Sequence, residues 1–354
     1  MRHSLQIKFE QAFPPDEWAG RRMILAVSGG PDSMALLRLT ADAASPGDRR
    51  GILVVHINHH LRGVESEEDA RFTHDAAQRH GFACQIVDCP LPPRESRHGS
   101  LEEAARKRRY AALLAEAESW GARYVLTGHT ADDQAETVLF RLVRGSGLRG
   151  LAGIPRVRSF GPTALTRPLL SFFRKEILAY LESLGQDYRR DRSNRDPQFR
   201  RNAIRHVILP LLQAQVSRAT TTQINRLADL ARECDDFVQS EVAAVWPRII
   251  AESAGDSLRL RVTELRRLHP FLIKEVIRAA WRQQGWPLRE MGYQRWTQLL
   301  EMVNEAPPWS TKNSPICYFP GNIQAQREGD DLVLQPVLAR SKQPARRSDV
   351  IANG

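Results

Sequence analysis

The sequence predicts an α/β fold in which a parallel sheet carries helices on both faces, followed by a smaller α+β domain. The main observation is that strand-like and helix-like segments alternate over residues 1–130. Strands are predicted at 24–27, 52–57, 82–87 and 123–127. Alternation of this kind favours parallel strands covered by helices. Such sheets bind ligands at the carboxyl ends of their strands, so functional residues are expected in the turns after the first, second and fourth strands.

The helices between these strands have recognisable ends. One helix is predicted over 66–80, where acidic residues begin it and Gly81 stops it. A capping box at 100–103 (Ser-Leu-Glu-Glu) begins another helix, which runs to Trp120. These signals support the helical half of the alternation.

A domain boundary is predicted at the start of a long helix over 217–248. Residues 1–216 then form the first domain, and residues 217–339 form a helical linker and a small α+β domain. The polar tail at 340–354 is expected to be disordered. The elements expected in the second domain are a strand at 257–262, helices at 269–284 and 293–303, and a hairpin within 322–336.

Composition restricts the class of protein and its partners. The 354 residues are 42% hydrophobic, which suits a globular protein with proper cores, and no apolar run approaches the ~20 residues that cross a bilayer. The N-terminus lacks the apolar segment of a secretory signal, and the four cysteines form no Cys-x-x-Cys pair, so a cytoplasmic location is expected. The net charge of +10 indicates a polyanionic partner, nucleic acid before membrane.

The turn Ser28-Gly-Gly-Pro-Asp-Ser33 has the composition of an anion-binding loop. Gly29 and Gly30 let a ligand approach the main chain, and the helix beginning near Asp32 or Ser33 points unpaired N–H groups at it. The Asp32 carboxylate would repel a phosphate unless a metal ion lay between them. The turn therefore favours a nucleotide bound with Mg²⁺. The alternative is a tight turn with Asp32 or Ser33 as a helix cap.

The turns after the second and fourth strands, "HINHHLR" and "GHTADDQAET", are also polar. In a parallel sheet Asp32, His129 and Asp133 converge at one edge, and a metal ion bridging Asp32 and one of the two later aspartates would explain both acidic turns. The alternative is that Asp132 and Asp133 are helix N-terminal acids favoured by the helix dipole.

Two other patterns are interpreted as structural. The three histidines within 56–60, near Cys84 and Cys89, lack the paired spacing of a transition-metal site. Residues 145–150 match Gly-x-Gly-x-x-Gly, but they follow a predicted helix instead of a strand. They are therefore expected to form a flexible loop near the site and not a dinucleotide-binding turn.

Basic residues gather in two stretches. Arg106 and Arg109 share one face of the helix predicted after residue 100. The stretch "YRRDRSNRDPQFRRNAIRH" (188–206) is denser, with seven arginines against two aspartates between 189 and 205. Its interleaved Asn, Tyr and Phe suit contacts with RNA phosphates and bases, and a solvated basic surface is the alternative.

Taken together, the motifs resemble those of a known family. The turn at 28–33 resembles the PP-loop of ATP pyrophosphatases, which cleave ATP between the α- and β-phosphates. "HINHHLR", "EEAARKRRY", "LTGHTADDQAETVLFRLVRGSGLRGLAGI", "RPLL" and "DRSNRDPQFRRNAIRHVILPLL", in this order, resemble the tRNA(Ile)-lysidine synthases. The resemblance spans residues 23–212 and is weak beyond them.

The resemblance implies a two-step reaction on a tRNA(Ile) with a CAU anticodon. ATP adenylates the C2 carbonyl oxygen of the wobble cytidine at position 34, and the ε-amine of L-lysine then attacks C2 and displaces AMP, leaving lysidine. The residues implied to bind ATP are Ser28, Gly29, Gly30, Pro31, Asp32, Ser33 and His56.

The resemblance also implies four catalytic residues. Asp32 and Asp133 would hold Mg²⁺, His129 would lie beside the phosphates, and Arg109 would contact the α-phosphate. These roles suit adenylation, which needs in-line geometry and neutralised phosphate charge more than an acid–base pair.

Further positions carry weaker implications. Asp132 is the less favoured metal ligand of the acidic pair, and Arg201 and Arg205 would face the active site or the tRNA. Thr130 stands where a second His is common in the family, and His60 where Gly is common. Many relatives also carry a further C-terminal domain that grips the tRNA acceptor region, and this chain ends too early for a full one.

Two other functions compete with this interpretation. Another PP-loop enzyme, such as a tRNA thiolase, would need a reactive thiol or iron–sulfur ligands, which the cysteine pattern does not supply. A non-catalytic RNA-binding protein on the same fold would not need Asp32, Asp133, His129 and Arg109. The oligomeric state is open, with a homodimer among the alternatives.

Overall fold

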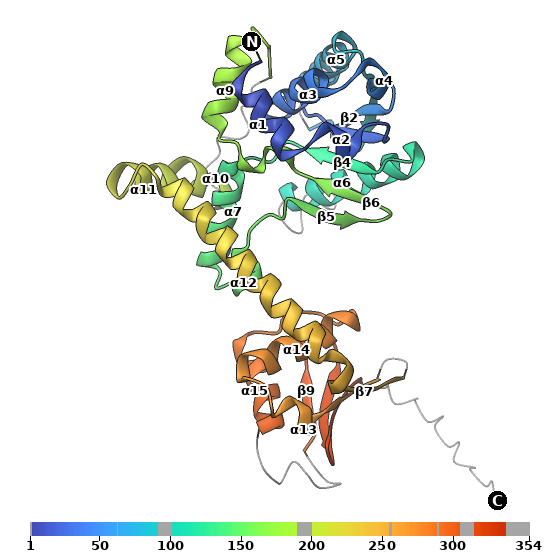
Figure 1. Cartoon of the computed structure of the whole chain (residues 1–354), viewed down its shortest axis with the longest axis vertical. Coiled ribbons are helices and arrows are strands. Elements are labelled where there is room, and N and C mark those ends of the chain that lie inside the picture. The colour runs from blue at the N-terminus through green and yellow to red at the C-terminus, as the bar shows by residue number, and fades with distance from the viewer. Residues whose placement is uncertain are drawn as a thin grey trace, which may run out of the picture. The chain divides into compact units, whose positions relative to one another are not determined.

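The computed structural model describes residues 2–61, 63–90, 101–189, 200–254, 257–288, 290–304 and 315–337. The chain divides into two compact units, Met1–Arg232 and Glu233–Gly354 (Figure 1). The capping residue predicted at Ser100, the middle of the basic stretch at 190–199, and the tail at 340–354 lie outside the described residues.

The first unit contains a six-stranded sheet in the order β3-β2-β1-β4-β6-β5. Every neighbouring pair is parallel except β5 with β6. The predicted α/β fold is therefore confirmed, with an antiparallel hairpin at one edge that the sequence pattern did not predict. The strands are β1 (Met23–Ala26), β2 (Ile52–Asn58), β3 (Ala83–Asp88), β4 (Tyr124–Thr127), β5 (Val157–Phe160) and β6 (Thr163–Thr166).

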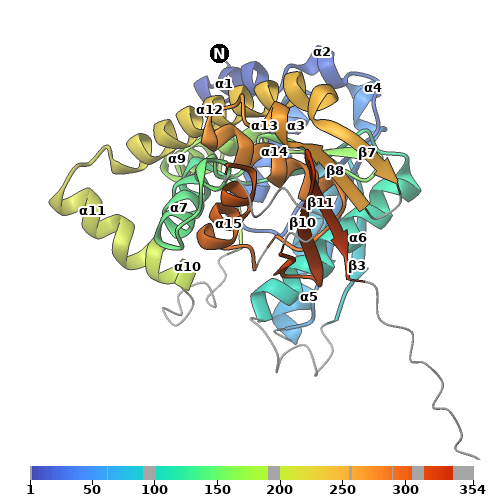
Figure 2. The same cartoon turned by 90° about the horizontal axis from the view of Figure 1, so that it is seen from below.

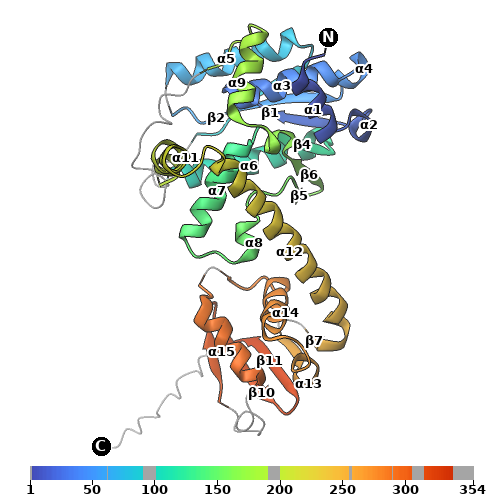
Figure 3. The ribbon, with the colours of Figure 1, turned by 60° about the vertical axis from the view of Figure 1, so that its left-hand side comes forward.

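Helices cover both faces of this sheet (Figure 3). The helix on one face is α6 (Leu101–Trp120), which shares an apolar cluster with β1, β2, β4 and the β5–β6 hairpin. The helices on the other face are α1 (Ser4–Ala12), α3 (Pro31–Ala43), α5 (Val64–Arg79) and α9 (Arg174–Ser183).

Strand β1 is apolar throughout because both of its faces are covered. Met23 and Leu25 lie in the cluster with α3, whereas Ile24 lies in the cluster with α6. All three side chains are fully buried. Side chains alternate between the faces of a strand, and burying each one stabilises the fold by roughly 1.5–3 kcal/mol. The central strand is thus held from both sides, and the turn that follows it starts from a fixed point.

Further helices follow β4 in the chain. Helix α7 (Ala131–Val143) comes directly after that strand, and α8 (Leu148–Leu151) begins within the segment 145–150, with Gly147 as its N-cap. The flexible loop predicted for this segment is therefore wrong in its second half. The other short elements are α2 (Pro15–Trp18), α4 (Pro46–Arg49), the 3-10 turn η1 (Pro168–Ser171), α10 (Arg200–Ala203), the π-turn η3 (Ile204–Ile208) and α11 (Leu209–Gln215).

The long helix α12 (Thr220–Ile249) contains the point, after Arg232, where the chain divides into its two units. The second unit has an antiparallel sheet in the order β7-β8-β11-β10-β9 (Figure 2). Its elements are β7 (Ile250–Ala254), β8 (Ser257–Arg261), α13 (Val262–Leu265), α14 (Pro270–Gln283), α15 (Tyr293–Asn304), β9 (Cys317–Phe319), β10 (Ile323–Glu328) and β11 (Asp331–Pro336).

Trp281 lies at the centre of the apolar cluster in the second unit. Its ring is fully buried and packs edge-on against Trp286, Trp296 and Phe319, with centroid distances of 5.0, 5.8 and 6.1 Å. Its indole N–H donates to the Pro287 carbonyl oxygen at 3.1 Å. Because one side chain joins α14 to both α15 and the sheet, this unit has a core of its own.

Replacing Trp281 by alanine is expected to lower the free energy of unfolding of the second unit by about 3–5 kcal/mol, because it opens a cavity where four aromatic rings meet. Urea unfolding followed by hydrogen exchange in peptides from 262–304 would measure it. Phe237, which is 66% exposed on α12, is the control, and its replacement by alanine should change the free energy by less than about 0.5 kcal/mol. Equal effects of the two substitutions would contradict this account of the core.

Candidate active site

The turn after β1 is held in shape by its own last residue. The Ser33 hydroxyl accepts the Ser28 backbone N–H at 3.2 Å and donates to the Gly30 carbonyl oxygen at 2.9 Å. Gly29 has a φ of +84°, which a side chain would disfavour. Pro31 then begins α3 with Gly30 as the N-cap, one or two residues before the predicted start. The turn therefore places the N-terminus of α3, the positive end of its helix dipole, at the carboxyl edge of the sheet.

Gly128 joins this turn to the turn after β4. A Cβ atom at Gly128 would lie 3.0 Å from the backbone carbon and oxygen of Asp32 and 3.1 Å from the backbone nitrogen of Ser33. Such distances are tighter than most Cβ contacts, so a side chain at Gly128 would push the two backbones apart by a few tenths of an ångström. The structure thus brings together Asp32 and the residues that follow Gly128, as the parallel order of β1 and β4 predicts.

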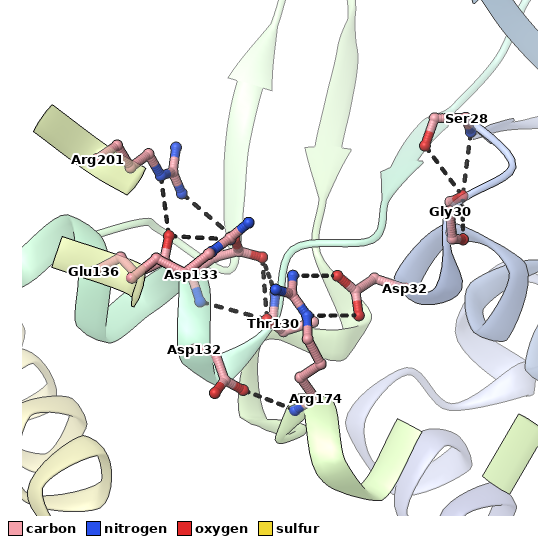
Figure 4. Close-up of polar contacts among 11 residues, drawn as sticks. Ser28, Gly30, Asp32, Thr130, Asp132, Asp133, Glu136, Arg174 and Arg201 are labelled. Carbon is pink, nitrogen blue, oxygen red and sulfur yellow. Dashed lines mark hydrogen bonds and ion pairs between the residues drawn. The ribbon is translucent and has the colours of Figure 1, made fainter. Parts of the chain in front are cut away.

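The Asp32 carboxylate is ion-paired with Arg174, the first residue of α9 (Figure 4). One guanidinium nitrogen lies 2.5 Å from Oδ2 and the Nε lies 3.5 Å from Oδ1. Burial raises the pKa of Asp32, and the charge of Arg174 opposes that effect without cancelling it. Arg174 was not selected from the sequence, because nothing in "SFFRKEIL" distinguishes its arginine from a solvated surface residue.

Asp133 and Glu136 share two arginines. The Arg205 guanidinium lies 2.8 Å from Asp133 Oδ1 and 2.5 Å from Glu136 Oε1, and that of Arg201 lies 3.4 and 3.1 Å from oxygens of the same two carboxylates. Figure 4 shows the carboxylates on α7 facing Arg201. Both predicted arginines therefore reach the site, and Glu136, which is 1% exposed, was missed. The signal was available, because residues three or four apart share a helix face.

Asp133 also caps its own helix. Its Oδ2 accepts the Thr130 backbone N–H at 2.9 Å, while the Thr130 hydroxyl accepts the Asp133 N–H at 3.4 Å. Burial acts to raise the pKa of Asp133, but His129 and the guanidinium groups of Arg201 and Arg205 outweigh it, so the pKa is lowered. The alternative of a helix N-terminal acid thus accounts for one oxygen of this carboxylate and the arginines for the other.

His129 is a neutral group at this site. Its Nδ1 lies 2.9 Å from the Thr127 hydroxyl. Burial lowers its pKa to about 3, although the charge of Asp133 acts in the opposite direction. Arg167 and Arg106 also disfavour its protonation. The side chain can therefore form hydrogen bonds with a ligand at neutral pH without adding charge.

Two predicted residues lie further from this cluster. His56 is buried beneath the turn, with Nδ1 3.0 Å from the Val27 carbonyl oxygen and 3.3 Å from the Thr73 hydroxyl. Arg109 is exposed on α6, and after the larger effect of burial its charge contributes to lowering the pKa of His59. The charge of Arg106, on the same helix, contributes to lowering the pKa of His129 after the larger effect of burial.

Arg189, near the start of the basic stretch, attaches this part of the chain to the glycine turn. Its backbone N–H donates to the Gly29 carbonyl oxygen at 2.9 Å, and its guanidinium contacts Asp69 and Glu68 on α5, each at 2.7 Å. The sequence grouped this arginine with the other basic residues as a nucleic-acid contact. Its observed contacts instead fix the turn to α5.

The described residues contain no group of three or more His, Cys, Asp or Glu side chains arranged for a metal ion. Among the histidines at 56–60, His60 pairs with Glu67 and Asp88 at 3.0 and 2.7 Å. Asp32 and Asp133 do offer the oxygen ligands that Mg²⁺ prefers, so their chemistry fits that ion. Both carboxylates hold guanidinium groups here, and a metal ion would have to replace them.

The chain is similar to proteins of a known family. Residues 1–212 match the family model of the PP-loop domain. The tRNA(Ile)-lysidine synthase of Symbiobacterium thermophilum is 42% identical over 246 residues, which cover 70% of this chain and 51% of the relative. That of Chlorobaculum tepidum is 37% identical over 270 residues, which cover 75% of this chain and 79% of the relative. The chain thus spans about half the length of the first relative.

A solved structure shares the fold. The U34-tRNA thiolase NcsA from Methanococcus maripaludis, with its 4Fe-4S cluster, superposes with a TM-score of 0.53 at 17% identity. The match covers 64% of this chain and 77% of that one. In the part of the chain that the structure describes, no helix is long and apolar enough to cross a membrane.

Gly128→Ala is expected to weaken ATP binding about tenfold or more, because the new methyl group displaces the backbone of Asp32 and Ser33. Isothermal titration calorimetry would measure the dissociation constant. Gly147→Ala is the matched control, because a Cβ there meets nothing within 4 Å and the residue has an extended backbone. If both variants bound ATP like the unaltered chain, the close approach at Gly128 would have no functional consequence.

His129 is expected to stay neutral down to pH 5, where a solvent-exposed histidine is mostly protonated. The unfolded chain takes up this proton below pH 6.5 and the folded chain only near pH 3, so stability is lost as the pH falls through that window. Between pH 7 and pH 5 the unaltered chain should lose about 1–2 kcal/mol more than His129→Gln. NMR of the chain labelled with ¹⁵N-histidine would measure this titration, with the His129 resonances assigned by their absence from His129→Gln. A His129 ring that titrates near pH 6.5 would contradict the expectation.

Proposed function

Because the chain belongs to the PP-loop family and, within it, to the tRNA(Ile)-lysidine synthases, we propose that it ligates L-lysine to a tRNA(Ile) with a CAU anticodon. The bond forms at C2 of the wobble cytidine, position 34, and changes codon reading from AUG to AUA. The observation that supports the proposal is that the charge of Asp133 acts on both Asp32 and His129, at the point where Gly128 lies against the backbone of Asp32.

The proposed reaction has two steps. In the first, the C2 carbonyl oxygen of the cytidine attacks the α-phosphorus of ATP, and diphosphate leaves with the electrons of the bond that breaks. In the second, the neutral ε-amine of lysine adds to C2 and loses a proton, and the C2–O bond breaks to release AMP. The protein must orient the reactants and balance phosphate charge in both steps.

The residues of the first unit have proposed roles in the adenylation step. Ser28–Ser33 would hold the phosphates with backbone N–H groups, and His129 would offer them an uncharged hydrogen-bonding group. Arg109 would contact the α-phosphate. Bound Mg²⁺ would neutralise phosphate charge, with Asp32 and Asp133 as its ligands.

The proposed partner is tRNA, and its binding would use basic residues beyond the PP-loop. The net charge of +10 and the arginines at 190–199 support this. Arg201 and Arg205 contact Asp133 and Glu136, which supports an active-site role for this pair over a role in tRNA binding. We also propose a cytoplasmic location and a tRNA-binding second unit. Light scattering would test whether the 40.1 kDa chain forms a homodimer.

The test is incorporation of labelled lysine into two transcripts with CAU anticodons, tRNA(Ile) and tRNA(Met), with and without ATP. ATP-dependent labelling of tRNA(Ile) alone is expected. Release of AMP on other tRNAs without lysine labelling would retain PP-loop chemistry and reject lysidine formation. Binding of tRNA with neither outcome would indicate a non-catalytic RNA-binding protein.

Asp32→Asn is expected to reduce lysine incorporation about 100-fold or more, because it removes a charge proposed to hold Mg²⁺ while it preserves side-chain size. Initial rates of labelling at saturating ATP would measure the loss. Asp42→Asn is the matched control, since Asp42 lies on the same helix and pairs with Arg38 at 2.9 Å. Equal activity of Asp32→Asn and the unaltered chain would remove Asp32 from the mechanism.

A further inference from the structure

The backbone of Arg174 is hydrogen-bonded to the first turn of α7. Its backbone N–H donates to Asp132 Oδ2 at 2.7 Å, and the Phe172 carbonyl oxygen accepts the Ala131 N–H at 2.9 Å. The first turn of α7 is therefore joined by one hydrogen bond to Arg174, the first residue of α9, and by another to Phe172, two residues before it. Because the backbone of Arg174 is fixed in this way, its guanidinium can move only by rotation about side-chain bonds, and it stays within one side-chain length of the PP-loop.

This guanidinium contacts the Asp32 carboxylate, which is also proposed to bind a metal ion. Both oxygens of Asp32 face Arg174, at 2.5 and 3.5 Å, and the two side chains are only 16% and 29% exposed. A carboxylate this far from solvent needs a positive partner. A divalent cation on Asp32 would supply that charge, and it would repel a guanidinium at the same oxygens.

A displaced Arg174 would have an anion close to it. Asp32 is in the first turn of α3, directly after Gly30 and Pro31 of the PP-loop, so phosphates held by that loop lie beside the Asp32 side chain. Arginine presents a fork of N–H donors that suits phosphate oxygens as well as carboxylates. Rotation of the Arg174 side chain would therefore replace its contact with the carboxylate by a contact with a phosphate.

We propose that Arg174 is an exchangeable cation of this site: it neutralises Asp32 while no nucleotide is bound, and it moves to the diphosphate portion of a nucleoside triphosphate when a divalent cation takes Asp32. The exchange rests on the proposed function, since it concerns how the same site accepts its metal–nucleotide complex. It makes Arg174 a competitor of the metal in one state and a ligand of the phosphates in the other.

This exchange predicts effects of opposite sign from one substitution. Arg174→Gln removes the competing charge, so the chain without nucleotide should bind Mn²⁺ about three- to tenfold more tightly. The same variant lacks the phosphate contact that forms once the metal holds Asp32, so inorganic diphosphate titrated at saturating Mn²⁺ should bind about tenfold more weakly. Electron paramagnetic resonance of free Mn²⁺ and calorimetric titration with diphosphate would measure the two affinities.

Two controls separate this exchange from loss of structure. Lys175→Gln, at the next position of α9 and over the Phe173 ring, should leave both affinities unchanged. Arg174→Lys keeps the charge, so both affinities should remain within about threefold of those of the unaltered chain. If Arg174→Gln weakened the binding of both ligands and Arg174→Lys restored it, Arg174 would be a structural support and the exchange would be wrong.

The remaining outcomes are equally decisive. Unchanged diphosphate affinity in Arg174→Gln would reduce Arg174 to a counter-ion of Asp32 and overturn the exchange, as would unchanged Mn²⁺ affinity. Neither measurement uses lysine or tRNA, so failure of lysine labelling leaves the result intact. Conversely, the unaltered chain could label tRNA with lysine while Arg174→Gln fails to change the Mn²⁺ and diphosphate affinities in opposite directions. That result would support the proposed function and reject the exchange.

Discussion

The close approach of two backbones, at Gly128 and at the first turn of α3, is the constraint on which the site depends. The parallel pairing of β1 with β4 places the ends of both strands at one edge of the sheet, and the absence of a side chain at Gly128 lets the following turns touch. Asp32 then lies beside the residues that begin α7. The turn after β1 by itself offers Asp32 and backbone N–H groups. The turn after β4, which packs against it, adds a neutral histidine and further carboxylates.

Charge compensation is the second constraint, and it determines which later parts of the first unit are needed. Asp32, Asp133 and Glu136 are largely withdrawn from water, and a buried carboxylate without a partner costs several kcal/mol. The guanidinium groups that compensate them come from α9 and from the α10–η3 segment, more than 35 residues further along the chain than Glu136. Guanidinium groups are also strong phosphate ligands, so the charges that stabilise these carboxylates also suit the binding of an anion.

The second unit meets a different constraint, because its stability comes from apolar packing. Trp281 contacts three other aromatic rings, and the inward residues of the antiparallel sheet complete the cluster. This unit therefore has its own core, while the site chemistry described above belongs to the first unit. The proposed division of labour, with adenylation in one unit and tRNA binding in the other, is compatible with cores that form independently.

The sequence by itself determined the alternation of strands and helices, the PP-loop, and the convergence of Asp32 with His129 and Asp133, because periodicity and glycine turns are local properties of the chain. Through their resemblance to a known motif it also placed Arg201 and Arg205 at either the active site or the tRNA, and the structure pairs them with Asp133 and Glu136. Only the tertiary structure decided the contacts of Arg174 and Arg189, the burial of His56 beneath the turn, and the β5–β6 edge. Which carboxylate an arginine pairs with depends on contacts between segments distant in sequence, and no local pattern encodes that choice.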